Sequence, residues 1–351
     1  MTGILPPFRK TTRLRASLFV LLVLPFLACG GEGPPSPNVG TVDSTVPPPG
    51  PPDTTGGDTI PAPPDTTGPV EPPYTPVHVG IPFGPSMNTK GKSYQLLLPP
   101  SSYLPEFTGV LQTAYPQVFL ASLEATRRAN GRVIISFTGN ERWNRDANGF
   151  NLAMWKQRVD RFRSIDFSSY IADGTIVGHF IMDEPSDKTN WNGHQVSLAD
   201  VDEMARYSKE IWPSMATIIR GWPAYLKGYH YQYLDAAWAQ YHKRFGDIDA
   251  FIASNVQDAK ASGLALVGGL NVLNGGTVES KIPGKSEGKF AMGAAEIRSL
   301  GSRILAEPYF CAFMMWQYDS LYFSRPEIQA AITDISKQAT SHPERACRRG
   351  T

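Results

Sequence analysis

A pair of adjacent carboxylates ends an apolar run in the middle of the chain, where residues 178–185 read Gly-His-Phe-Ile-Met-Asp-Glu-Pro. Glu184 is our candidate proton donor, because a carboxyl group half-buried at the end of a strand has a raised pKa and keeps its proton. Cleavage of a glycosidic bond needs such an acid and a second carboxyl group, about 5–5.5 Å away for a nucleophile or about 6.5–9.5 Å for a base. Acid catalysis by a carboxyl pair is therefore the first chemistry that the sequence suggests.

Three other acidic residues are candidates for the second carboxyl group: Asp183, Glu141 and Asp319. Asp183 neighbours Glu184 in a strand, so its side chain should point to the opposite face unless the chain bends there. Asp319 and Glu141 follow other predicted strands, and of these two we favour Asp319. Each acid also has a structural interpretation. Asp183 and Glu184 would form ion pairs with Arg220, Asp319 would cap a turn before the last helix, and Glu141 would be a solvated loop residue.

Amides, a guanidinium group and aromatic rings follow the predicted strands at the same end. Amides and guanidinium groups offer paired hydrogen-bonding atoms to hydroxyl groups, and aromatic rings present flat apolar faces for the C–H faces of a sugar. We therefore predict that this edge binds a glycan. The candidate substrate-binding residues are Asn140, Arg220, Trp238, Gln240, Asn271, Trp316, Gln317 and Tyr318.

Short apolar runs alternate with helical patterns from residue 77 onward, which indicates a parallel α/β fold. Residues 77–351 number 275 (351 minus 76), which suits a single (β/α)8 TIM barrel of about 250 residues with its active site at the carboxyl ends of the strands. No clear helix follows the first strand, because residues 88–105 look irregular. The predicted strands are Val77–Phe83, Thr108–Gln112, Arg132–Phe137, Thr175–Met182, Ala216–Arg220, Leu234–Trp238, Ala265–Leu270 and Phe310–Trp316.

Two predicted helices begin with the spacing of a capping box, in which a hydroxyl residue is followed three positions later by an acidic one. Ser197 and Asp200 precede the apolar positions Val201 and Met204 of one helix. Ser324 and Glu327 have the same spacing before the last helix, whose apolar positions are Ile328, Ala331, Ile332 and Ile335.

The apolar fourth strand ending in Glu-Pro, together with Trp316 at the end of the eighth, resembles the TIM-barrel glycoside hydrolases of the large retaining clan. The resemblance implies that Glu184 is the general acid/base and that Trp316 is a platform for a sugar ring. This sequence departs from the clan in having Asp183 where the clan has an asparagine. Its seventh strand also ends in Gly-Leu-Asn-Val-Leu-Asn-Gly-Gly, without the nucleophilic glutamate, so the resemblance does not supply the second carboxylate.

The N-terminus has the pattern of an export signal, with Arg and Lys residues at 9–15, an uncharged run over 16–28 and then Cys29. Residues 26–30, Phe-Leu-Ala-Cys-Gly, resemble a bacterial lipobox, which implies that Cys29 is lipidated after removal of residues 1–28. Because glycine rather than aspartate follows the cysteine, the resemblance favours the outer membrane. The alternative is a short membrane anchor that stays attached.

Residues 29–76 are predicted to be a disordered linker. Residues 30–76 contain 15 prolines in 47 positions and no Lys or Arg, so too little apolar surface is present to offset the entropy of the chain. The organisation predicted from the sequence is thus a signal peptide over 1–28, the linker over 29–76 and the barrel over 77–351.

Composition argues against several other functions. The 33 basic and 32 acidic residues give a net charge of +1, which is atypical of a nucleic-acid-binding protein. The six histidines have no metal-binding spacing, so we expect neither a metal nor another cofactor. Cys311 opens the eighth strand at the end of the barrel to which the last helix returns, and we predict a disulfide from it to Cys347. A buried free Cys311 is the alternative.

The function predicted from the sequence is hydrolysis of an extracellular glycan by a monomeric, lipid-anchored protein of the cell envelope. Its partners would be the glycan and, through the lipid alone, the membrane. Two alternatives remain at this point. A non-catalytic glycan-binding lipoprotein would keep the polar edge but lack the second carboxylate, and a purely structural envelope protein would have the barrel mouth filled by loops.

Overall fold

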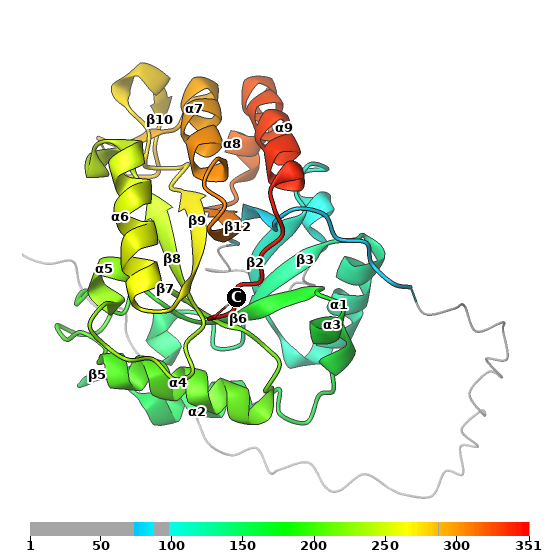
Figure 1. Cartoon of the computed structure of the whole chain (residues 1–351), viewed down its shortest axis with the longest axis vertical. Helices are drawn as coiled ribbons and strands as arrows, with labels where there is room; N and C mark the ends of the chain where they lie inside the picture. Colours follow the sequence, from blue (N-terminus) through cyan, green and yellow to red (C-terminus); the bar gives the residue numbers. More distant parts are fainter. Residues whose placement is uncertain (1–73, 88–97, 287, 351) are drawn as a thin grey trace, which may run out of the picture. The chain divides into compact units, whose positions relative to one another are not determined.

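The computed structural model describes residues 74–87, 98–286 and 288–350 (Figure 1). The predicted signal peptide, the lipidation at Cys29 and nearly all of the predicted linker lie outside these residues. Within the described ranges, every helix is too short or too polar to cross a bilayer.

Eight parallel strands form one sheet that curves into a barrel. Their order around the barrel is β1-β12-β9-β8-β7-β6-β3-β2. The ring closes between β1 and β2, where Ser86 forms a bridge with Leu111 and the Met87 N–H donates to the Leu111 carbonyl at 2.9 Å. The fold is therefore the predicted (β/α)8 TIM barrel. The strands are β1 Phe83–Pro85, β2 Gly109–Thr113, β3 Arg132–Ser136, β6 Ile176–Asp183, β7 Thr217–Arg220, β8 Ala236–Tyr241, β9 Ala265–Leu270 and β12 Phe310–Met315.

Helices surround the strands, as Figure 1 shows for α4, α6, α7 and α9. Two small hairpins, β4 Arg145–Asp146 with β5 Gly149–Phe150 and β10 Ile282–Pro283 with β11 Phe290–Ala291, extend the loops after β3 and β9. The α-helices are α1 Phe119–Arg128, α2 Leu152–Asp160, α3 Ser168–Ala172, α4 Leu198–Ile211, α5 Pro223–Leu226, α6 Ile248–Ala261, α7 Ala294–Leu305, α8 Ser320–Phe323 and α9 Pro326–Ser341. The 3-10 turns are Pro100–Ser102, Pro116–Val118, Glu141–Trp143, Lys243–Phe245 and Val278–Ser280.

The strands are mostly apolar, because they bury both faces. In β6, Phe180 lies in the apolar cluster inside the barrel, whereas Ile181 lies in the larger cluster between the strands and the helices. This alternation follows from the two-residue period of a strand, and it explains why the predicted strands read as continuous apolar runs. Gly269 in β9 is needed for close packing, since a Cβ there would lie 1.8 Å from the Met314 carbonyl oxygen of β12.

The first strand begins later than predicted. It starts at Phe83 instead of Val77, because Pro82 has no N–H to donate and Gly80 has a φ of +61° that interrupts an extended chain. The Ile81 N–H donates instead to the Ala339 carbonyl of α9 at 3.1 Å. Between β1 and β2, the described residues contain the 3-10 turn Pro100–Ser102, and residues 88–97 of the segment that we predicted to be irregular lie outside the described residues.

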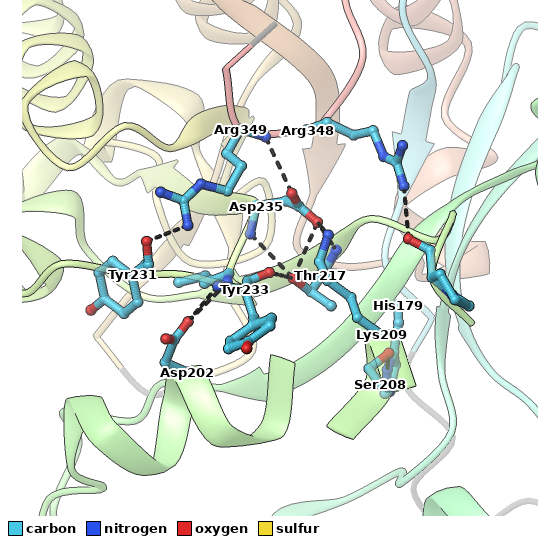
Figure 2. A network of polar contacts seen from close by, with 12 residues as sticks. His179, Asp202, Ser208, Lys209, Thr217, Tyr231, Tyr233, Asp235, Arg348 and Arg349 are labelled. Atoms are coloured by element: carbon cyan, nitrogen blue, oxygen red, sulfur yellow. Dashed lines mark hydrogen bonds and ion pairs between the residues drawn. The ribbon is translucent and has the colours of Figure 1, made fainter. Parts of the chain in front are cut away.

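The sixth predicted strand, Leu234–Trp238, is also shifted, since β8 spans Ala236–Tyr241. The buried Asp202 of α4 is the reason. Its carboxylate accepts hydrogen bonds from the backbone N–H groups of Gln232, Tyr233 and Leu234 at 2.9–3.0 Å, which holds this segment in a turn (Figure 2).

One of the two predicted helix starts is confirmed. The Ser197 hydroxyl accepts from the Asp200 N–H at 3.0 Å and contacts the Asp200 carboxylate at 2.7 Å, at the beginning of α4. The prediction for Ser324 is wrong, because Ser324 ends α8 and α9 begins at Pro326 after Arg325. Proline suits the first position of a helix, where no N–H is needed, so Pro326 sets this boundary.

The C-terminal tail crosses the amino-terminal end of the barrel. Cys311 of β12 and Cys347 of the tail form a disulfide with a Cα–Cα distance of 5.1 Å, and both residues belong to the apolar cluster inside the barrel. Beside it, the buried Asp235 carboxylate contacts Lys209 Nζ at 2.7 Å and the Arg349 N–H at 3.3 Å (Figure 2). The tail thus lies across the end of the barrel opposite to the carboxyl ends of the strands, where it lines a cavity of about 660 Å³.

Candidate active site

A cleft opens at the carboxyl ends of the strands, where the barrel architecture places an active site. It consists of a cavity of about 310 Å³ and an adjoining one of about 150 Å³, which share Glu141, Asp183, Arg220, Trp238 and Trp316. The barrel mouth is therefore not filled by loops, as it would be in a purely structural protein. Other residues that line the larger cavity are Glu184, Ser186, Asn190, Trp222, Gln240, His242, Arg244, Phe245, Asn271, Asn274 and Lys289.

Asp183 and Glu184 meet on one guanidinium group. Arg220 Nη2 lies 3.0 Å from Asp183 Oδ2 and 3.2 Å from Glu184 Oε1, and Arg220 Nε also donates to Asp183. Strand alternation alone would separate the two side chains. The chain bends at Glu184, whose φ of +40° is uncommon for a residue with a side chain, and both carboxylates consequently reach Arg220.

Two hydrogen bonds hold the backbone of this bend. The Glu184 N–H donates to the Arg220 carbonyl at 2.8 Å, and Trp191 Nε1 donates to the Glu184 carbonyl at 3.0 Å. The Asn190 side-chain amide contacts Glu184 Oε2 at 3.4 Å. The position of the Glu184 carboxyl group is thus defined by β6, β7 and the loop that follows β6.

The pKa of Glu184 is raised above the usual value for a glutamate. Burial is the largest cause, the positive charge of Arg220 opposes it, and the negative charges of Asp183 and Asp187 add to it. A raised pKa keeps the carboxyl group protonated to higher pH, which is the state that a general acid needs.

Arg220 is a fixed cation in the centre of the cleft. Burial alone would lower the pKa of its guanidinium group, but Asp183 and Glu184 outweigh that effect and the pKa is raised. Its Nη1 donates to Gln240 Oε1 at 3.2 Å, and its guanidinium carbon lies 5.7 Å from the centre of the Trp238 ring.

Two buried donors beside Arg220 have no hydrogen-bond partner in the described part of the chain. They are Gln240 Nε2 and Trp238 Nε1, from side chains that line the larger cavity. Buried polar groups are ordinarily paired, so an unpaired donor at a cavity indicates a place for an acceptor from a ligand. A sugar hydroxyl group is an acceptor of this kind.

Glu141 is the other carboxylate at this cleft. It opens the 3-10 turn after β3, where the Asn140 side chain accepts from the Arg142 N–H, and it lines both cavities. Asp319, which we favoured from the sequence, is not among the residues that line either cavity. Its carboxylate accepts from the Tyr322 N–H at 3.0 Å and so caps α8, with Lys285 Nζ 3.9 Å away. The structure thus gives Asp319 the helix-capping role.

The remaining candidates divide between the cleft and the core. Asn271 and Trp316 are bridged at the ends of β9 and β12 and line the larger cavity, whereas Asn140 and Gln317 line the smaller one. Tyr318 lines neither cavity. Its ring stacks on Phe323 with centroids 5.6 Å apart and contacts Tyr103 at 5.1 Å, so it belongs to an aromatic layer beside the cleft.

Several lining residues were not predicted from the sequence: Ser186, Asn190, His242, Arg244, Phe245 and Lys289. His242 and Arg244 follow β8 directly, so a correct end for that strand would have revealed them. Lys289 lies in the turn between β10 and β11, and no spacing in the sequence indicates that this turn reaches the cleft. Among the residues that the structure describes, no three His, Cys, Asp or Glu side chains are grouped as metal ligands would be.

Fold and cleft together define a TIM barrel with carboxylates and indole rings at the carboxyl ends of its strands. No protein-family model and no curated protein sequence matches the chain. Among solved structures it is similar to Saccharomyces cerevisiae Gas2p in complex with laminaritriose and laminaritetraose, with 9% identity, a TM-score of 0.47, and 77% of this chain and 66% of that chain covered. A structure of ScGas2 in complex with compound 7 gives 9% identity, a TM-score of 0.49, and coverages of 77% and 67%.

A β-glucuronidase from an uncultured Clostridium species is also similar, with 11% identity, a TM-score of 0.45, and 68% of this chain and 43% of that chain covered. This chain thus spans about two thirds or less of the chains to which it is similar. Identity and TM-score are too low to assign a family, and the barrel is established by its own strand order.

Proposed function

We propose that the protein is a glycoside hydrolase that cleaves an extracellular glycan, with Glu184 as the general acid. The observation that supports this most is the position of Glu184 at an open cleft, with a raised pKa and with Glu141 lining the same cavity. An acid and a second carboxyl group at one cleft are the groups that glycoside hydrolysis requires.

In the proposed reaction, the Glu184 carboxyl group donates its proton to the glycosidic oxygen while the bond from that oxygen to the anomeric carbon breaks. Glu141 either takes a proton from the water that attacks the anomeric carbon or attacks that carbon itself before water releases the sugar. Arg220 binds both carboxylates and so orients Glu184 beside Asp183. Trp316, which is half-buried at the cleft, offers aromatic surface to a sugar ring.

The test is incubation of the purified protein with a panel of neutral and acidic polysaccharides, with new reducing ends as the readout. We expect at least one glycan to be cleaved. Binding of a glycan without cleavage would favour the non-catalytic alternative, and neither binding nor cleavage across the panel would contradict the proposal.

Two substitutions test whether Glu141 or Asp319 is the second carboxyl group of the reaction. We expect Glu141→Gln to lower kcat on a cleaved glycan by about 100-fold or more, because carboxylates in this role contribute about 10²–10⁴-fold. Asp319→Asn should leave kcat within about twofold of wild type, because asparagine also caps a helix. A large loss of kcat in Asp319→Asn, with Glu141→Gln active, would reverse the assignment.

The raised pKa of Glu184 predicts the shape of the pH profile. The group is protonated below its pKa, so kcat/KM should be retained at lower pH and fall as the pH rises through that pKa, above the ordinary glutamate range. Asp187→Asn removes one of the charges that raise this pKa and should move the fall to lower pH.

The Asp187→Asn variant leaves local structure intact, because asparagine can accept the hydrogen bond that Asp187 Oδ1 receives from the Thr189 N–H. Rates measured between about pH 4 and 9 for both proteins test the prediction. If kcat/KM falls at the same pH in both proteins, or at higher pH in the variant, the ionisation of Glu184 does not determine the fall at high pH.

We further propose that the protein is exported and anchored through a lipid on Cys29, because basic residues, an uncharged run over 16–28 and then Phe-Leu-Ala-Cys-Gly at 26–30 form the pattern of a lipoprotein signal. The Cys311–Cys347 disulfide supports an oxidising compartment. Metabolic labelling with a radioactive fatty acid tests the anchor. Labelling of wild type and its loss in Cys29→Ser are expected, and an unlabelled wild type would contradict the proposal.

A further inference from the structure

The charge of the cleft changes along its length. Its carboxylates come from the ends of β3 and β6, Arg220 stands at the end of β7, and Arg244 and Lys289 follow β8 and β9. Because the strands are ordered β9-β8-β7-β6-β3 around the barrel, the acidic and basic groups lie on opposite sides of Arg220.

The two outer cations differ from Arg220 in having no ion pair with an acidic residue that the structure describes. Arg220 binds Asp183 and Glu184, whereas the Arg244 guanidinium group lies over the Phe245 ring, 4.9 Å from its centre. The Arg244 backbone N–H donates a hydrogen bond to His242 Nδ1 at 3.0 Å. Both outer cations are exposed at the cleft, so their charge is available to a ligand.

His242 adds a donor to this end of the cleft. Burial lowers its pKa, and the positive charges of Arg244 and Lys289 lower it further, so the ring is neutral. Since Nδ1 accepts a hydrogen bond, the proton of the neutral ring is on Nε2. The backbone of Asn274 lies close enough to the ring to oppose this lowering of the pKa, but His242 Nε2 is buried and forms no hydrogen bond of good geometry in the described part of the chain.

The charges of the catalytically competent cleft do not balance. Three cations (Arg220, Arg244 and Lys289) face three carboxyl groups (Glu141, Asp183 and Glu184), and Glu184 must be protonated to act as an acid. Protonation leaves three positive charges against two negative ones, an excess of one positive charge on the side of β8 and β9. An anionic group on the substrate would neutralise this excess.

We propose that the substrate is an acidic glycan, whose carboxylate or sulfate group binds Arg244 and Lys289 while Glu184 acts on a neighbouring linkage. This inference rests on the proposed function and narrows its substrate class. Arginine offers paired N–H donors to the two oxygens of a carboxylate or a sulfate, and lysine adds a second charge.

The experiment measures binding on an array of matched glycans, each present in carboxylated, sulfated and neutral forms. It uses the full chain carrying Glu184→Gln, which prevents cleavage and resembles the protonated acid. We expect the acidic forms to bind at least about 10-fold more tightly than their neutral counterparts. Comparison of the carboxylated with the sulfated glycans identifies the anion that the protein prefers. Binding of the preferred form should weaken as the salt concentration is raised.

Adding Arg244→Ala and Lys289→Ala should weaken binding of the preferred acidic glycan by about 10-fold or more and leave binding of neutral glycans unchanged. Lys243→Ala is the matched control, because Lys243 is exposed beside Arg244 but does not line the cavity. The control should bind within about twofold of the parent protein.

Equal binding of acidic and neutral glycans, or no loss of binding in the Arg244 and Lys289 variant, would overturn the inference. If the wild type nevertheless cleaves a neutral glycan, the proposed function stands without it. If no glycan on the array is bound and none is cleaved, both fail.

Discussion

Glu184→Gln is expected to lower kcat/KM on an unactivated glycan by about 10³-fold, within the range of about 10²–10⁴ for loss of a general acid. Glutamine has nearly the same shape and can still accept the hydrogen bond from Arg220, but its amide has no acidic proton to transfer to the leaving oxygen. The measurement is the initial rate of release of reducing ends, with circular dichroism to show that the variant is folded.

The choice of substrate sharpens this prediction. A glycoside with an activated aryl leaving group needs little protonation, so Glu184→Gln should lose far less activity on it than on the natural linkage. Glu210→Gln is the surface control, because Glu210 pairs with Arg206 on α4 and does not line the cleft. A folded Glu184→Gln protein with the wild-type rate on the natural linkage would exclude Glu184 as the acid.

Loss of the Cys311–Cys347 disulfide should destabilise the barrel by about 4 kcal/mol, the value expected from chain entropy for a loop of this size. The bond joins residues 36 apart in sequence, and it holds the tail against the amino-terminal end of the barrel. Equilibrium unfolding in urea of the Cys311→Ala/Cys347→Ala protein, beside oxidised wild type, measures the difference.

A reductant provides the matching control for the disulfide. It should lower the free energy of unfolding of wild type by a similar amount and leave that of the double variant unchanged. A difference of less than about 1 kcal/mol between oxidised and reduced wild type would show that the tail contributes little to stability.

The eight-stranded barrel could be predicted because strands buried on both faces leave continuous apolar runs in the sequence. The bounds of β1 and β8 could not, because tertiary hydrogen bonds take up the backbone groups in front of each strand, before β1 together with the effects of Pro82 and Gly80. The Asp202 carboxylate holds the segment before β8, and the carbonyl of Ala339 in α9 takes the N–H of Ile81 before β1. Neither partner is near in sequence to the strand that it delimits.

The residues of the candidate site were predictable where local sequence places them, and unpredictable where tertiary contacts do. Asp183, Arg220 and Trp238 were predicted because they lie within strands or at their ends. For Asp319, the sequence left both a catalytic role and a capping role open, and the structure shows that its carboxylate accepts from the Tyr322 N–H at the start of the four-residue helix α8. Arg244 and Lys289 were missed because their places in the cleft depend on loops.

The most direct test of the central claim is a crystal structure of the Glu184→Gln protein with an oligosaccharide that the wild type cleaves. We expect a glycosidic oxygen within about 2.6–3.2 Å of the side chain at position 184, the reach of a proton donor. Glu141 should lie near the anomeric carbon of the same linkage. A sugar chain bound with every glycosidic oxygen beyond hydrogen-bonding distance of position 184 would contradict the account.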